Sequence, residues 1–455
     1  MLSGLYTALS GINAHRQMID ATSHNVANQA TPGYHRQIID VRAGGLGATG
    51  VFSGAKYQPG GVDATGVRRA IDTLAENRLV RETALNAGAT TLAANLERIE
   101  MAFTEPVDNG LAAQLDDFWG GWSDLATVPG DSAMRSQLLE RAQSVIDTLQ
   151  RANADLDAAA LGAEQEIFAL AADVNELASR IAQLNGAIAG STTTPNDLLD
   201  QRDALVRDLS ALTGAIARPG QGGQIDVSIG GRSIVYGANS QRVNGAGGVL
   251  TWEADGSTVQ APDSKAASLQ AIISDVVPRY RTKLDGVAAA LVNGVNGLHT
   301  TGYDLTGTTG RNFFDPGSVT AASISLSADV VGQPQNLAAG APVFPGPVAP
   351  GPLDGGMASQ IAQIAESATG PDSVYRSLVA DLGVETRAAV QRSDVQGQVT
   401  AAAQRVADSV GSVSIDEEMV AMVAAQRGYE ASARVLTAVD QLLETLINRT
   451  GVVGR

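Results

Sequence analysis

The feature that most constrains the fold is a run of about fifty residues whose apolar positions recur in alternating steps of three and four. Such a seven-residue repeat places its apolar residues on one face of an α-helix. At 1.5 Å per residue this helix would be roughly 75 Å long, so its apolar face must lie along other helices. The one polar position, Asn153, either fixes the register between helices or is a tolerated polar residue in a hydrated layer. The repeat comprises Leu139, Ala142, Ile146, Leu149, Asn153, Leu156, Ala160, Ala163, Ile167, Leu170, Val174, Leu177, Ile181, Leu184 and Ile188.

Both ends of the chain carry a similar repeat. Ser414-Ile415-Asp416-Glu417 is a capping box and predicts where the last helix begins. Two paired terminal helices require the middle of the chain to loop out between them, which favours a polymerising or interaction protein. A hairpin of two such helices is marginal alone, so we expect these ends to order on assembly. The two repeats are Leu2, Leu5, Leu9, Ile12, Ile19 and Val26, and Ile415, Met419, Met422, Gln426, Tyr429, Ala433, Leu436, Leu443 and Ile447.

Between the ends, the patterns predict more helices and a small β module. Period-two alternation and the hairpin signals Asn244-Gly245 and Asp255-Gly256 place the β module at about 215–262. Pro278 should kink or restart its helix. Helices are expected over 71–103, 111–125, 197–212, 265–298 and 357–410, the last broken near 370–371, and short strands over 38–41 and 323–326.

Composition excludes several classes of function. The chain has 455 residues and no Cys, which rules out disulfides, thiol nucleophiles and Cys-ligated metals. The net charge of −17 argues against an extensive phosphate-binding surface, and no apolar run is long enough to span a membrane. Met1–Val26 has no basic n-region and no compact apolar h-region, so we expect any export to leave the N-terminus uncleaved.

No motif points to catalysis. Gly45–Gly50 reads G-x-G-x-x-G, but no helical pattern follows it, so a flexible connector is the better interpretation than a cofactor site. The histidines are His15, His24, His35 and His299; none forms a metal-binding pair at i, i+4, and surface or interface roles are expected. We therefore predict no enzyme, no catalytic residues, no cofactor and no metal.

The residues that follow the first helix carry a recognisable motif. Ala27-Asn28-Gln29-Ala30-Thr31-Pro32-Gly33-Tyr34 resembles the A-N-x-x-T-P-G-Y signature of the bacterial flagellar axial proteins, which include rod, hook and hook-associated proteins. The extension His35-Arg36-Gln37 is similar to the hook-associated protein 1 family, which forms the hook–filament junction. The segments 5–12 and 416–435 also resemble that family, whereas the β module matches no motif of it.

This resemblance implies a structural, secreted protein of the flagellum, required for motility. Family members leave the cell unfolded through the flagellar type III secretion channel, without a cleaved signal peptide. They polymerise at the hook tip and join hook to filament. The implied partners are further copies of the chain, the hook protein, a second junction protein (hook-associated protein 3) and an export chaperone on the C-terminal helix; no nucleic acid and no membrane insertion is expected. A hook or distal-rod axial subunit is the alternative.

The resemblance and the repeats together predict a fold and an assembly surface. The fold is expected to be mainly α, with a smaller β-rich inserted domain and a coiled coil of terminal helices. The nested domains would be 1–50 with 408–455 as the inner core, 51–214 with 263–310 and 355–407 as the long-helix domain, and 215–262 with 311–354 as the outer domain. The assembly interface is predicted at Leu5, Leu9, Ile12, Asn25, Asn28, Thr31, Pro32, Gly33, Tyr34, Arg36, Gln37, Ile415, Met419, Met422, Gln426, Tyr429, Ala433, Leu436 and Leu443.

One residue departs from the family pattern. Gly428 stands where the family usually has a polar residue, inside the predicted last helix. Glycine weakens a mid-helix position by about 1 kcal/mol relative to alanine. The chain is also short for the family, which predicts a reduced outer region.

Overall fold

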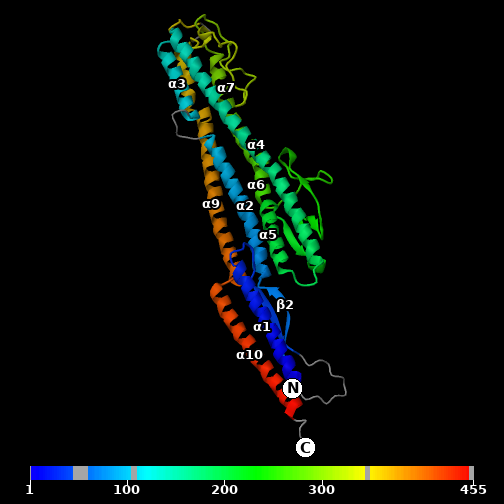
Figure 1. Ribbon diagram of the computed structural model, residues 1–455. Helices are drawn as coiled ribbons and strands as arrows, with labels where there is room; N and C mark the ends of the chain where they lie inside the picture. Colours follow the sequence, from blue (N-terminus) through cyan, green and yellow to red (C-terminus); the bar gives the residue numbers. More distant parts are fainter. Residues whose placement is uncertain (1, 45–59, 104–109, 344–348, 450–455) are drawn as a thin grey trace, which may run out of the picture.

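The computed structural model describes residues 2–44, 60–103, 110–343 and 349–449. The molecule is long and mainly helical (Figure 1). A pair of terminal helices forms one end, a body of longer helices forms the other, and a short joint connects them. The described ends of the chain, residues 2 and 449, both lie at the free end of the terminal pair.

The terminal pair consists of α1 (Leu2–Asn28) and α10 (Ile415–Arg449), which lie side by side along their length (Figure 1). A two-stranded antiparallel sheet packs on α1, formed by β1 (Gln37–Ala43) and β2 (Val62–Arg69). The predicted strand over 38–41 is therefore part of β1, and both predicted terminal helices are confirmed.

Eight α-helices of the described residues build the body. The pair α2 and α9 runs from the joint along one side, and α4 runs along the other, with α5, α6 and α7 packed on it (Figure 1). Their bounds are α2 (Thr73–Met101), α3 (Leu111–Thr127), α4 (Ser132–Ala189), α5 (Asn196–Thr213), α6 (Lys265–Ala271), α7 (Val277–His299), α8 (Gly356–Ala362) and α9 (Pro371–Gly411).

The long helix predicted from the heptad repeat is α4, with 58 residues. Asp131 caps its N-terminus by accepting hydrogen bonds from the backbone N–H groups of Ala133 and Met134. Most repeat positions are buried against neighbouring helices, as the pattern predicts. Asn153 donates to Asp157 of the same helix, so this bond fixes no register between helices, and the interpretation as a tolerated polar residue is the better one.

An aromatic cluster closes the end of the body that lies far from the joint. Phe118 and Trp122 of α3 pack on Phe313 and Phe314, with ring centroids 5.3–6.2 Å apart. His299 stacks edge-on against Trp122; its Nδ1 donates to the Arg311 carbonyl, and its Nε2 accepts from the Ala338 N–H. Burial lowers the pKa of His299 to about 4, so it is a neutral core residue.

The β module packs against the part of α4 near the joint. One antiparallel sheet has the order β3-β4-β5-β6, and a second pairs β7 with β8. Asn185 of α4 donates to the carbonyls of Ile225 and Gly237, which ties the first sheet to the helix. The strands are β3 (Ile216–Pro219), β4 (Ile225–Ile229), β5 (Arg232–Tyr236), β6 (Asn239–Ser240), β7 (Val243–Asn244) and β8 (Thr251–Trp252).

Two local predictions meet different outcomes. Pro278 lies in the first turn of α7, and a π-helical segment (Ile272–Val276) precedes it, so the predicted restart of the helix is confirmed. The strand predicted over 323–326 is wrong: Leu326 makes a single bridge to Phe314 within a run of turns. The apolar side chains there are held by the core instead, because Ile324 is fully buried beside the aromatic cluster.

The two segments predicted to share an outer domain lie at different places along α4. The sheet strands contact residues near Asn175 and Asn185. The segment after residue 311 contacts the first turns of α4, where the buried Arg135 donates to the carbonyls of Pro129, Pro334 and Leu337. Burial lowers the pKa of Arg135 to about 10.

The Gly45–Gly50 motif lies outside the described residues. Within the described ranges, no helix is long and apolar enough to cross a membrane. In the same residues, no three His, Asp or Glu side chains gather as metal ligands would.

Candidate assembly interface

The two terminal helices meet through small residues. A methyl group at Gly4 would lie 3.6 Å from Val439, and one at Gly11 would lie 2.8 Å from Ser432 Oγ. Each of these pairs has residue numbers that add to 443, as do Asn25 and Glu418, which are joined by a hydrogen bond. The constant sum shows a regular antiparallel pairing, and the small side chains let the two helices approach closely.

We call this contact the small-residue seam. On α1 it includes Gly4, Gly11, His15 and Asn25, and on α10 it includes Glu418, Gly428, Ser432 and Val439. The apolar repeats that predicted the two helices are mostly not in it. The sequence signal was present but easily overlooked, because Gly, Ala and Ser at heptad spacing are less conspicuous than Leu and Met.

The larger apolar residues lie at the edges of the seam or outside it. Leu9 and Met419 are each 48% exposed. Of the other predicted interface residues, Ile415, Gln426 and Tyr429 are exposed, and Leu5, Ile12, Met422, Ala433, Leu436 and Leu443 are half-buried. Further exposed apolar residues on the pair are Tyr6, Val420, Val423, Val435, Leu442, Leu446 and Ile447. The terminal pair therefore has apolar surface that its own chain does not cover.

Gly428 has a specific role in the seam. The His15 ring lies on it, and a methyl group there would be 2.4 Å from His15 Cε1. No side chain fits at this position while the ring stays in place. The glycine that departs from the family pattern thus accommodates a histidine on the facing helix.

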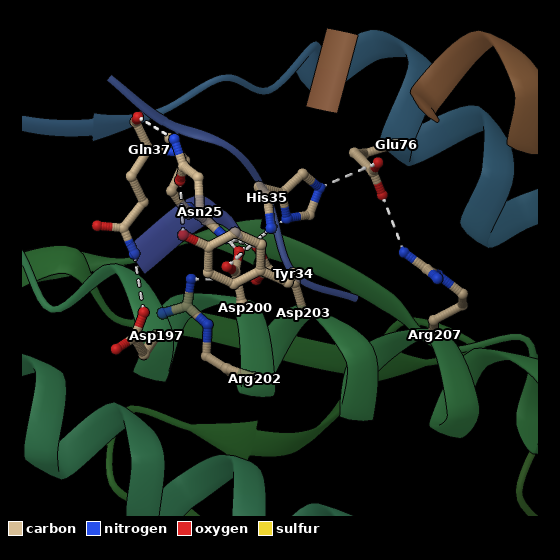
Figure 2. A network of polar contacts seen from close by, with 11 residues as sticks. Asn25, Tyr34, His35, Gln37, Glu76, Asp197, Asp200, Arg202, Asp203 and Arg207 are labelled. Atoms are coloured by element: carbon tan, nitrogen blue, oxygen red, sulfur yellow. Dashed lines mark hydrogen bonds and ion pairs between the residues drawn. The ribbon is translucent and has the colours of Figure 1, made fainter. Parts of the chain in front are cut away.

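Asn25 connects the end of α1 to the turn that follows it (Figure 2). Its Oδ1 accepts from the Gln37 N–H at 2.8 Å and from the Tyr34 hydroxyl at 2.7 Å. Its Nδ2 donates to the Gln37 carbonyl and to Glu418 Oε2, both at 3.0 Å. All four hydrogen bonds of the amide are made, so this residue fixes the positions of the turn, β1 and α10 together.

Arg36 joins the body to the terminal pair. Its Nε donates to Glu418 Oε1 at 2.6 Å, and the Glu418 side chain is almost completely buried. Its backbone N–H donates to the Gly411 carbonyl at the end of α9, and its carbonyl accepts from the Ala70 N–H. The two segments that connect the body to the terminal pair, one after β2 and one after α9, therefore meet at Arg36. Of the neighbouring residues Glu417 and Glu418, Glu418 is buried in the joint, whereas Glu417 is exposed.

His35 lies at the centre of an ionic cluster that holds the joint (Figure 2). Its Nδ1 donates to Asp200 Oδ1 at 2.7 Å, its backbone N–H donates to Asp200 Oδ2, and its Nε2 lies 3.4 Å from Glu76 Oε1. Hydrogen bonds to Asp200 and then Glu76 raise the pKa of His35 to about 9. The ring is therefore charged at neutral pH.

Two arginines complete this cluster. Arg69 pairs with Asp200 at 2.7 Å and Asp203 at 2.9 Å, and Arg207 pairs with Glu76 at 3.1 Å. Burial opposes ionisation of Glu76, but the His35 hydrogen bond and the Arg207 charge outweigh it and lower its pKa. The cluster ties the turn after α1 to β2, α2 and α5. Sequence reasoning assigned His35 an unspecific surface or interface role and did not identify its acidic partners.

The structure therefore divides the predicted site residues into two groups. Asn25, Tyr34, Arg36 and Gln37 make hydrogen bonds within their own chain, including one from Gln37 Nε2 to Asp197 at 2.8 Å. Asn28 accepts from the Thr31 hydroxyl; Thr31 and Pro32 are exposed, and Gly33 takes a positive φ of 76° in the turn. The apolar residues of the terminal helices form the other group, whose members are exposed or half-buried.

Comparison with known proteins identifies this architecture. The helical domain of the flagellar hook-associated protein FlgK matches residues 96–314. The flagella basal body rod protein family matches 5–35, and the C-terminal family of the basal body rod FlgEFG proteins matches 412–449. Flagellar hook-associated protein 1 of Bacillus subtilis is 26% identical over 99% of both chains. The chain is therefore similar to flagellar hook-associated protein 1 along almost its whole length.

Further relatives and a solved structure agree. Flagellar hook-associated protein 1 of Escherichia coli is 23% identical over 98% of this chain and all of its own length. That of Salmonella typhimurium is 27% identical over 72% of this chain and 62% of its own length. The flagellar hook junction protein FlgK from Burkholderia pseudomallei has the same fold, with a TM-score of 0.62 at 15% identity, over 72% of this chain and 99% of that one. The mainly α fold with a smaller β region is thereby confirmed.

Proposed function

We propose that this chain is a structural subunit of the hook–filament junction of the bacterial flagellum. The single observation that carries the proposal is the terminal pair: small residues hold α1 against α10, and large apolar residues remain exposed around it. Apolar surface of this kind is buried when copies associate. The similarity to flagellar hook-associated protein 1 supports a structural role in the flagellum.

The distribution of charge supports an inner position for the terminal pair. Residues 1–43 and 412–449 contain six basic and eight acidic residues, whereas the rest of the chain has 25 basic and 40 acidic residues. A nearly neutral segment can be packed among copies of itself without strong repulsion, and an acidic body is suited to solvent. We propose 1–50 with 408–455 as the inner core, with the long-helix domain around it and the β-rich segments outside.

We further propose the residues and partners of assembly. The interface would be formed by the exposed and half-buried apolar residues of the predicted set, such as Leu9, Met419 and Tyr429. The partners would be further copies, the hook protein and hook-associated protein 3. The chain would be exported unfolded without signal cleavage, and an export chaperone would cover α10 beforehand. It would have no enzymatic activity.

The experiment that tests this function is deletion of the gene followed by complementation. We expect polymerised hooks without filaments, filament protein shed into the medium, and full attachment restored by the intact chain. In the complemented strain, Leu9→Glu should reduce attachment strongly because it places a charge in the proposed contact. Leu74→Glu, at an exposed leucine of α2, is the matched control and should not. Normal filaments in the deletion strain would contradict the proposal.

The rod-family matches at both ends keep one alternative open, a hook or distal-rod subunit. The same deletion separates the two functions. Loss of a hook or rod subunit prevents hooks from forming, whereas loss of the junction protein leaves hooks intact.

A further inference from the structure

Helix α9 carries an apolar stripe on the face that its own chain leaves open. The stripe follows steps of three and four and consists of Val384, Ala388, Gln391, Val395, Gln398, Ala402 and Val406. Its three valines are 52–66% exposed. The opposite face of α9, which includes Leu382, Ala389 and Ala403, is buried, and α2 and α7 pack on the helix. A heptad-spaced stripe is what a further helix would pack on.

Arginines flank this stripe. Arg387, Arg392 and Arg405 are exposed, and none of them makes an ion pair with another described residue. On a helix they lie on either side of the valines, where charged residues set partner choice in coiled coils. The exposed Asp394 also borders the stripe, so three arginines and one aspartate give this edge a net positive charge in a chain with a net charge of −17.

Helix α4 has a matching open stripe. Its exposed face carries Ala154, Ala158, Leu161, Gln165, Phe168 and Ala172, also in steps of four and three. Phe168 is 66% exposed and Leu161 54% exposed, although the opposite face of α4 is the buried heptad repeat. Asp155 and Asp173 flank this stripe, are exposed, and pair with no described cation. The exposed Arg151 borders the N-terminal end of this stripe. The two stripes are thus similar in spacing, with mostly acidic flanks on α4 and mostly basic flanks on α9.

The stripes lie on opposite sides of the body. Both α2 and α7 contact α4 and also contact α9, so they lie between the two helices. Both α4 and α9 run from the far end of the body toward the joint (Figure 1). The α4 stripe spans about 27 Å and the α9 stripe about 33 Å, at 1.5 Å per residue.

We propose that the α9 stripe of one copy packs on the α4 stripe of the next copy, with the two helices parallel. The contact is heterologous, because each copy offers a different face to each neighbour, and such contacts continue from copy to copy around an assembly. Since α4 ends at Ala189 and α9 at Gly411, both near the joint, Leu161 comes level with Val384 and Ala172 with Val395. The inference rests on the proposed function and names the lateral contact between bodies.

Cross-linking in assembled flagella tests this contact. Because the chain has no natural Cys, only the introduced cysteines of this chain can react. Two single-cysteine variants are co-expressed in the deletion strain and treated with a short bismaleimide. We expect Leu161→Cys with Val384→Cys, and Ala172→Cys with Val395→Cys, to yield cross-linked dimers of this chain. A double variant, Ala172→Cys/Val395→Cys, should give longer multimers. Val331→Cys, at a comparably exposed valine outside both stripes, should give none when paired with Leu161→Cys.

Charge reversal provides a second readout. Arg392→Glu should lower the cross-linking yield about threefold, the effect of one exposed ion pair, and Arg232→Glu on the β module should leave it unchanged. Absence of cross-linked dimers in cells whose filaments are attached would overturn this contact and leave the proposed function intact. Cross-linking to a protein of different mass, instead of to a second copy, would also overturn it. Failure of the proposed function shows separately, as filaments that remain attached without the chain.

Discussion

The terminal pair and the body place their large apolar side chains on opposite sides of their helices. In the body, Trp122, Phe118 and Phe313 are fully buried within one chain. In the terminal pair, Gly11 and Gly428 lie inside while Leu9 and Met419 are exposed. Each fully buried large side chain contributes about 1.5–3 kcal/mol, and the terminal pair gains little of this within one chain. The body therefore holds its own fold, whereas the terminal pair depends on neighbours.

The largest expected effect comes from removing α10. Deletion of 414–455 should abolish filament attachment, because α1 then loses its partner and half of the proposed contact surface. The purified variant should keep the thermal unfolding transition of the body, measured by tryptophan fluorescence, since all three Trp lie in the body. Attached filaments in this strain, or loss of the body transition, would show that the two regions are not distinct in this way.

Next in size is a cavity in the body. Trp122→Ala should destabilise the body by about 3–5 kcal/mol, because it removes the largest fully buried side chain. Denaturant unfolding of the purified chain measures this. The matched change Phe168→Ala, at an exposed aromatic of α4, should cost far less. Equal losses from the two variants would contradict the assignment of a core to α3 and α7.

A smaller effect is expected in the small-residue seam. Gly428→Ala should weaken the α1–α10 pairing by about 1–3 kcal/mol, because the new methyl group collides with the His15 ring. Adding His15→Ala should restore the pairing. Gly383→Ala on α9 is the control, since its new methyl group meets nothing closer than 3.6 Å. Alanine has a higher helix propensity than glycine, so this change should stabilise α9. Helical circular dichroism during thermal unfolding compares the three variants.

The smallest effect concerns the joint between the two regions. The folded pKa of His35, about 9, is raised above its unfolded value near 6.5. Its stabilising contribution is therefore fully present below pH 6.5 and is lost as pH rises through 9. His299 does not titrate in this window, because burial keeps its pKa at about 4. The free energy of unfolding of the wild type should fall between pH 7 and 9.5, and that of His35→Gln should fall less. If the free energies of unfolding of the two proteins change with pH in parallel, His35 does not have this role.

The sequence predicted the body better than the joint for a physical reason. The α4 repeat is local and strongly periodic, so its helix could be recognised directly. The terminal helices were also recognised, but the faces that pair with each other were not, because Gly11, Gly428 and other small residues form them and the larger apolar residues lie at the edges or outside. The hydrogen bond between His35 and Asp200 joins residues 165 positions apart, and no local sequence pattern indicates such a contact. The segment around Ile324 resembled a strand only because four residues are too few to distinguish a strand from a buried turn.

Amide hydrogen exchange of the purified monomer tests the contrast between the two regions most directly. We expect rapid exchange along 2–26 and 415–447, because these helices bury mostly small residues, and slow exchange along α4 and α7, which form the core. In assembled junctions the terminal segments should become protected. Strong protection of the terminal helices in the monomer, equal to that of α4, would contradict the account.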